Sequence, residues 1–146
     1  MGGQQVHEPV MTIADLDAFL RREFPQMFRD GEVFTVLEVS SGRATVRFDP
    51  TDHHLRPGGT VSGPSLFTLA DVSAYIVTLA HIGPVALAVT TNLNINFLHR
   101  PKPGSLLATC RILKLGKRLV VTDTEMADAD GTMVAHATAT YSVPPR

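Results

Sequence analysis

Hydrophobic positions near the start of the chain predict a short amphipathic helix. Thr12 is followed three residues later by Asp15, which is the spacing of a capping box at a helix start. Apolar side chains then recur at helical spacing up to Pro25, which cannot continue a helix. They are Ile13, Leu16, Phe19, Leu20 and Phe24. The pattern therefore predicts a helix that begins after Thr12 and ends at Pro25.

The next region changes to the alternation expected of strands. Residues 32–39 are rich in β-branched side chains, Ser41-Gly42 is a turn signal, and residues 43–48 alternate between apolar and polar positions. This predicts a hairpin with one solvent-facing side. Residues 49–59 (DPTDHHLRPGG) have the Pro, Gly and Asp density of a surface loop, long enough to shape a pocket.

A second, longer helix is predicted to begin at Ser62 and end at Gly83-Pro84. Ser62 is a good N-cap, and Pro64 is tolerated in a first turn. The helix is apolar on nearly every side, so we expect protein to surround it. Its most apolar stretch, residues 66–82, carries Asp71 and His81 and is too short and too polar for a membrane span.

Four β-like runs follow the long helix, at residues 85–98, 106–115, 119–126 and 132–143. One long helix between two early and four later strands, with hairpin-sized gaps, predicts an α+β fold in which an antiparallel sheet wraps a central helix. We expect residues 1–10 to form a loose leader and residues 11–146 to form a single domain.

Composition narrows the classes of function. With 44% hydrophobic and 18% charged residues the chain is an ordinary globular protein, and a net charge of −1 argues against nucleic acid as a partner. One cysteine, Cys110, allows no internal disulfide, and residues 1–9 lack the order of a signal peptide. We therefore expect a cytoplasmic protein with no membrane partner. No spacing of carboxylates and histidines indicates a metal site, and no cofactor is expected.

Asp71 is the most informative single residue. A carboxylate two turns into an apolar helix is costly to desolvate unless it is paired or faces a cavity. It can serve as a base or nucleophile in an enclosed site, or it can cap a backbone group or lie in a subunit contact. The residues alone leave both interpretations open.

The helix start offers a second candidate element. Unpaired N–H groups at a helix N-terminus can stabilise a developing oxyanion, and Gly63 would allow a ligand carbonyl to approach closely. The alternative is that Ser62, Gly63 and Pro64 only cap and start the helix.

The segment 59–71 resembles the hotdog acyl-CoA thioesterases of the phenylacetate-pathway type. The signature of that family is Asn-x-x-Gly-x-x-His-Gly-Gly, then four residues, Leu, one residue and an acid. The residues that match in register are Gly59, Gly63, Leu69 and Asp71. The resemblance covers residues 33–143, including the Asn-Leu-Asn-Ile-Asn-Phe-Leu-His-Arg-Pro run at 92–101. It implies a hotdog fold, here with an extra N-terminal helix.

The resemblance also implies roles for particular residues. Asp71 would be the general base or nucleophile, Gly63 would donate its N–H to the thioester carbonyl, and Thr90 of the other subunit would orient water. Three positions depart from the family: Arg56 stands for its Asn, Ser62 for its His and Pro64 for its second Gly. Since one oxyanion donor is worth roughly 10²- to 10³-fold in rate, these changes predict either altered catalysis or binding alone.

Positive charge in two loops suggests where coenzyme A could bind. Arg100 lies in one loop and Lys117 and Arg118 in another, at the ends of predicted strands, where they would contact phosphates or simply be solvated. We treat Arg56, Gly59 and Pro64 as further substrate-binding candidates, beside the catalytic candidates Asp71, Gly63, Thr90 and Ser62.

These observations lead to a ranked set of functions. The first is an acyl-CoA thioesterase that hydrolyses a fatty or aromatic acyl thioester and works as a homodimer or a homotetramer built as a dimer of dimers. The second is a non-catalytic acyl or aromatic ligand binder. The third is an acyl-thioester hydratase or dehydratase, ranked last because segment 59–71 contains no His for the usual His and acid pair.

Overall fold

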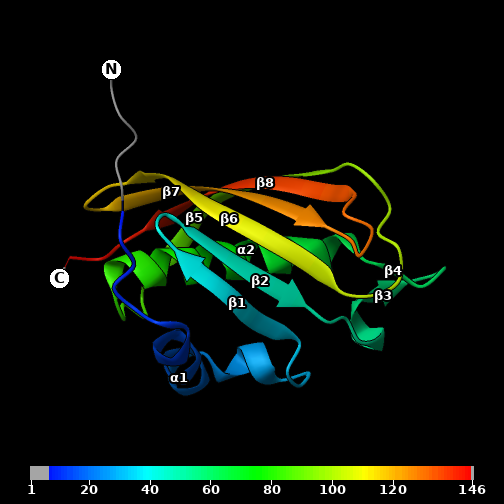
Figure 1. The fold of residues 1–146 in the computed structure, drawn as a ribbon, viewed down its shortest axis with the longest axis horizontal. Coiled ribbons are helices and arrows are strands. Elements are labelled where there is room, and N and C mark those ends of the chain that lie inside the picture. Colours follow the sequence, from blue (N-terminus) through cyan, green and yellow to red (C-terminus); the bar gives the residue numbers. More distant parts are fainter. Residues whose placement is uncertain (1–6, 146) are drawn as a thin grey trace.

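The computed structural model describes residues 7–145, in which a curved antiparallel sheet wraps the central helix α2 (Gly63–Ile82) (Figure 1). The sheet has six strands in the order β1-β2-β6-β7-β8-β5. Their bounds are β1 Phe34–Ser40, β2 Arg43–Phe48, β5 Val89–Phe97, β6 Leu106–Leu115, β7 Leu119–Ala127 and β8 Met133–Ser142. The predicted α+β architecture, a hotdog arrangement with an additional N-terminal helix, is confirmed.

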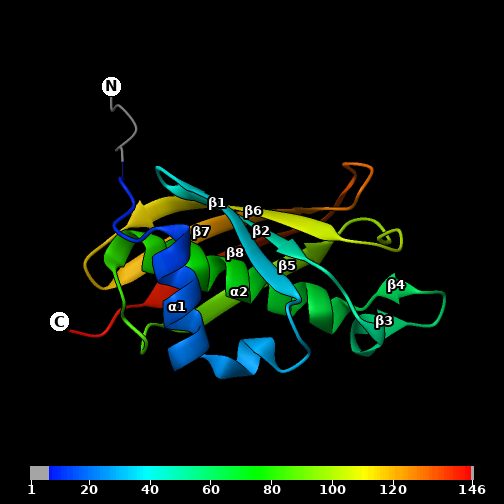
Figure 2. The ribbon, with the colours of Figure 1, turned by 60° about the horizontal axis from the view of Figure 1, so that its bottom comes forward.

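The N-terminal helix α1 (Ile13–Glu23) begins as its sequence predicts. The Thr12 N–H donates to Asp15 Oδ2 over 3.0 Å, and the Asp15 N–H donates to Thr12 Oγ1 over 3.1 Å, so the capping box is present. After α1 the chain continues as a short 3₁₀ helix, Pro25–Phe28. Helix α1 packs against β1 and α2 on the side of α2 away from the rest of the sheet (Figures 1 and 2).

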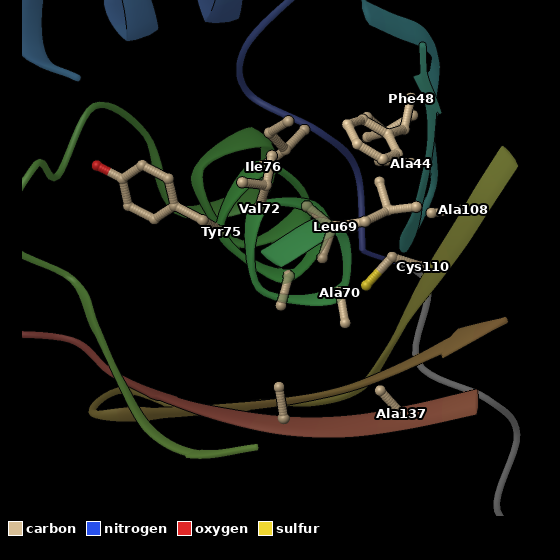
Figure 3. Close-up of a cluster of buried hydrophobic side chains, with 14 of the residues drawn as sticks. Ala44, Phe48, Leu69, Ala70, Val72, Tyr75, Ile76, Ala108, Cys110 and Ala137 are labelled. Carbon is tan, nitrogen blue, oxygen red and sulfur yellow. The ribbon is translucent and has the colours of Figure 1, made fainter. Parts of the chain in front are cut away.

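Helix α2 forms the centre of the core. Ser62 caps it by accepting the Ser65 N–H at 3.3 Å, and it ends at Gly83, whose φ of +97° favours glycine. By length and composition α2 could cross a membrane, but 78% of its most apolar 18-residue window is buried by the rest of the protein. Its own apolar side chains point outward in several directions, and Cys110 lies between the helix and the sheet (Figure 3). It is therefore the buried core helix of this fold.

Two segments differ from their predictions, and a third is described only in part. Within residues 49–59 the chain forms a 3₁₀ turn at Asp52–His54 and a strand, β3 (Leu55–Arg56), which pairs with β4 (Thr60–Val61). Residues 85–88 precede β5 rather than belonging to it. Part of the predicted leader, residues 1–6, lies outside the described residues, whereas residues 7–10 are held in place: the Val10 N–H donates to Ala80 O over 2.7 Å.

The two edge strands of the sheet differ in what packs against them. Edge strand β1 has α1 packed against it, but edge strand β5 carries exposed apolar side chains, among them Val89 and Phe97, which are 54% and 55% exposed. Leu87 just before β5 and Leu98 just after it are also exposed. An uncovered apolar edge strand favours pairing with another strand.

Candidate active site

Asp71 lies on α2 where the start of β5 and the end of β8 come together. Its Oδ1 accepts a hydrogen bond from Thr90 Oγ1 at 2.5 Å and another from the Tyr141 hydroxyl at 2.8 Å. The Tyr141 hydroxyl also lies 3.1 Å from the backbone oxygen of Asp71. The carboxylate is therefore paired with neutral donors rather than a cation, and its charge remains available for chemistry.

A β-bulge in β5 aims Thr90 at this carboxylate. Thr90 pairs with Tyr141, and the register shifts before Asn92, which pairs with Thr140. Side chains alternate along a strand, so without the extra residue Thr90 would share the outer face of the sheet with Asn92. The bulge instead turns Thr90 inward beside Tyr141.

Tyr141, one of two stacked tyrosines, contacts Asp71 directly. Tyr141 is only 3% exposed, and its ring stacks against that of Tyr75 with centroids 6.0 Å apart. The Tyr75 hydroxyl donates to Ala86 O at 3.1 Å, which holds the connection between α2 and β5. Burial and the charge of Asp71 raise the pKa of Tyr141 well above its usual range, so this phenol keeps its proton.

The start of α2 forms a second polar region. Gly63 lines a cavity of about 500 Å³ together with Arg56, Pro64, Phe97 and Arg100. A Cβ built on Gly63 would stand 3.4 Å from the Phe97 ring, an ordinary contact, and the φ of Gly63 is not positive. Neither packing nor backbone conformation within this chain therefore demands glycine here, which leaves close approach of a ligand as a reason for it.

Other predicted residues near the helix start have structural partners. The Ser62 hydroxyl donates to Ser65 Oγ at 2.9 Å while capping α2, so its contacts are those of a cap. Gly59 has a φ of +76° in the turn between β3 and β4, and its N–H donates to Arg56 O over 3.0 Å. Pro64 occupies the first turn of α2 and is exposed.

The structure separates the predicted cationic residues into two groups. Arg56 and Arg100 line the cavity at Gly63. Lys117 and Arg118 lie in the β6–β7 turn, and Arg118 Nε donates to Val143 O at 2.9 Å, two residues beyond Tyr141. Within one chain the second group therefore lies at the Asp71 end of the sheet, away from Gly63.

Thr90 and Gly63 differ in their distance from the Asp71 of the same chain. The resemblance implies that Thr90 of the other subunit orients water; within one chain, Thr90 donates a hydrogen bond to Asp71. Gly63 and Asp71 are eight residues apart on α2, which is about 12 Å along a helix, too far for both to contact one thioester carbonyl. A site that uses both needs two chains.

Sequence reasoning missed Tyr141, and it placed His99 in a basic loop without locating it beside Gly63. Tyr141 gave no signal because it lies 70 residues from Asp71 and reads as an ordinary strand residue. His99 lines the same cavity as Gly63, and its Nδ1 lies 3.0 Å from Met133 O, so this side chain supplies an imidazole that segment 59–71 lacks. Cys110 is fully buried, and burial raises its pKa to about 11, as expected of a structural thiol.

Known proteins share the fold of this chain. A solved structure of a proposed thioesterase from Silicibacter sp. TM1040 shares 46% identity with a TM-score of 0.85, over 97% of each chain. The Streptococcus mutans UA159 protein smu.793, solved with acetyl-CoA bound, shares 28% identity with a TM-score of 0.69, over 79% of this chain and 91% of its own. A proposed esterase of Saccharolobus solfataricus is 27% identical over 141 residues, covering 92% of this chain and 87% of its own length.

The chain also matches the profile of a whole protein family. Residues 58–135, more than half of the chain, match the sequence profile of the thioesterase superfamily. The matched segment contains both Gly63 and Asp71 and the whole of α2. The chain therefore belongs to the thioesterase superfamily.

Proposed function

We propose that this protein is an acyl-CoA thioesterase that hydrolyses a fatty or aromatic acyl thioester to the free acid and coenzyme A. The observation that carries the proposal is Asp71, a carboxylate on a mostly apolar core helix that is held by two hydroxyl donors. Membership of the superfamily and the thioesterase and esterase relatives support thioesterase activity in general.

Asp71 would act as general base or as nucleophile. As a base it takes a proton from water, whose oxygen then forms a bond to the thioester carbon. The C–S bond breaks, and the departing sulfur takes up the proton as the thiol of coenzyme A. As a nucleophile the carboxylate itself attacks the same carbon, and the C–S bond breaks to release the thiolate of coenzyme A and leave an anhydride on Asp71. Water then hydrolyses this anhydride to the free acid and the Asp71 carboxylate, and the proton released in that step converts the thiolate to the thiol.

A dimer through β5 would bring the two halves of the site together. Thr90 stands at one end of β5 and Phe97, which covers Gly63, at the other. If two copies of this exposed edge pair antiparallel about a two-fold axis, the Thr90 end of one strand faces the Phe97 end of its partner. Gly63 of the partner subunit then approaches Asp71. A homodimer, or a dimer of dimers, is the assembly we infer from this geometry.

The same pairing would unite the cationic side chains around coenzyme A. Arg56 and Arg100 from one chain and Lys117 and Arg118 from its partner would come to the phosphates. The acetyl-CoA bound to the Streptococcus mutans relative supports this choice of ligand. We place the protein in the cytoplasm, where acyl-CoA is made and used, with no nucleic acid or membrane partner.

Thiol release from short, medium, long and aromatic acyl-CoAs tests the proposal. We expect Asp71→Asn to lower kcat by about 100-fold or more, the size of one general-base contribution. Asp17→Asn, which changes an exposed carboxylate on α1 that pairs with Arg21, is the matched control and should keep parental activity. Equal and negligible rates in the parent and in Asp71→Asn would reject the thioesterase.

A non-catalytic ligand binder is the second candidate. It is favoured by one specific observation: Ser62, which replaces the family's histidine, is engaged in capping α2. This candidate predicts that acyl-CoA raises the Tm without any release of thiol. If saturating acyl-CoA produces no shift in Tm, the binder is rejected as well.

A further inference from the structure

Two hydroxyl donors converge on the same oxygen of Asp71. Thr90 Oγ1 lies 2.5 Å and the Tyr141 hydroxyl 2.8 Å from Oδ1, and a carboxylate oxygen has two lone-pair directions to offer. Within residues 7–145 the other oxygen, Oδ2, accepts no hydrogen bond. The two oxygens of the acid are therefore in different chemical situations.

Tyr141 is a donor fixed by the fold. It is buried, its backbone is the register partner of both Thr90 on β5 and Val120 on β7, and its ring is stacked on Tyr75. A strand residue with neighbours on both sides has little freedom to move. Because burial keeps the phenol protonated, its hydroxyl can donate to the carboxylate at any working pH.

Tyr141 also ties the acid to the helix backbone. The same hydroxyl lies 3.1 Å from Asp71 O, so its one proton is shared between the side chain and the main chain of the same residue. This arrangement fixes the carboxylate relative to the axis of α2. Thr90, at the bulge in β5, is the second donor to Oδ1 and reaches it from the adjacent strand.

We propose that Tyr141 is a positioning residue that, together with Thr90, occupies Oδ1 of Asp71 and leaves Oδ2 as the oxygen that meets water or the thioester. The inference rests on the proposed function, and it assigns Thr90 to holding the acid rather than to orienting water. Oδ2 then takes the proton from water, or bonds to the carbonyl carbon, without first losing a partner within its own chain.

The first test compares two buried tyrosines. Tyr141→Phe removes only the hydroxyl, and we expect kcat to fall about tenfold, the worth of one hydrogen bond, while KM stays within about twofold. Tyr75→Phe is the matched control, because it removes a similar hydroxyl that bonds Ala86 and not Asp71, and should keep parental kcat. Parental kcat in Tyr141→Phe, or equal losses in both variants, would overturn the inference.

The second test uses the other donor. Thr90→Val should lower kcat about tenfold, and Thr90→Ser, which keeps the hydroxyl, should restore most of the rate. Because either donor alone can still hold Oδ1, the double variant Tyr141→Phe with Thr90→Val should lose more than the product of the single losses. If the loss in kcat of the double variant equals the product of the two single losses, a shared role of the two donors is contradicted.

An activity-independent measurement separates this inference from the proposed function. Urea unfolding of the parent, Tyr141→Phe, Asp71→Ala and the double variant forms a double-mutant cycle in which each single change removes one partner of the hydrogen bond, and coupled changes in the unfolding midpoint would demonstrate that bond. Additive midpoints would reject the contact even in an active enzyme. A parent that releases no thiol from any thioester would reject the proposed function, and with it the catalytic role of Tyr141, whatever the cycle shows.

Discussion

The start of α2 and the surroundings of Asp71 differ in every chemical respect, although they lie on one helix. The helix start offers N–H groups, an open glycine and the arginines at 56 and 100 around a cavity of about 500 Å³. The Asp71 region offers a carboxylate, two hydroxyls and a pair of stacked tyrosine rings. One region is suited to receive negative charge and the other to supply it.

In the proposed enzyme, this difference would explain why each chain carries two half-sites. The helix start uses the positive end of the helix dipole, which fades within the first turn. A carboxylate placed in that turn would pair with the same N–H groups and lose its reactivity, so the acid must stand further along α2. About 12 Å of helix then separates the two regions, and only a second copy of the chain can unite them.

The largest effect is expected from an experiment that disables each region in a different chain and tests whether the two regions form one site. Gly63→Pro removes the N–H at a helix position that tolerates proline, and we expect a loss of about 100-fold or more in kcat. Asp71→Asn should lose as much. If the two inactive variants are unfolded together and refolded as a mixture, half of the dimers are mixed and each has one intact site, so about a quarter of the parental rate should return.

The control for this mixing experiment is each variant refolded alone, which should stay inactive. Circular dichroism of Gly63→Pro should match that of the parent, so that the loss cannot be assigned to unfolding. Light scattering shows whether the refolded mixture forms dimers. If it does and the thioesterase rate still does not recover, the two regions do not form one shared site.

A smaller effect is expected from the cationic residues near each region. Arg100 lines the cavity at Gly63, whereas Lys117 lies at the Asp71 end of the sheet. Both are exposed, so Arg100→Ala and Lys117→Ala should each raise KM for acyl-CoA by roughly twofold to fivefold, and less at high salt. Arg22→Ala on α1 is the matched control, and an equal effect of all three changes would argue against a phosphate contact.

The smallest expected effect separates capping from catalysis at the helix start. Ser62→Ala removes the cap of α2 and should lower the free energy of unfolding by about 1 kcal/mol. Ser62→Asn keeps a capping side chain and should recover most of that loss. If Ser62 only caps α2, kcat should change less than about twofold in both variants. A large fall in kcat at unchanged stability would instead show that Ser62 takes part in catalysis.

Much of the fold was predictable because its signals are local. The Thr12 and Asp15 pair fixed the start of α1, Pro25 its end, and the alternation of residues 43–48 gave β2. Asp71 could be singled out because a charge in an apolar helix is visible without a structure. The ribbon of β3 and β4 was missed because two-residue strands leave almost no periodicity in a sequence rich in Pro and Gly.

The sequence by itself determined the architecture and the family and singled out Asp71 as a candidate, because hydrophobic period, caps and motif spacing act over a few residues. Only the tertiary structure decided what surrounds the acid. Tyr141 contacts Asp71 across 70 residues, and Thr90 faces it because one bulge reverses the alternation of β5. Such contacts depend on how strands are registered against a helix, and that register is set by the packing of the whole core.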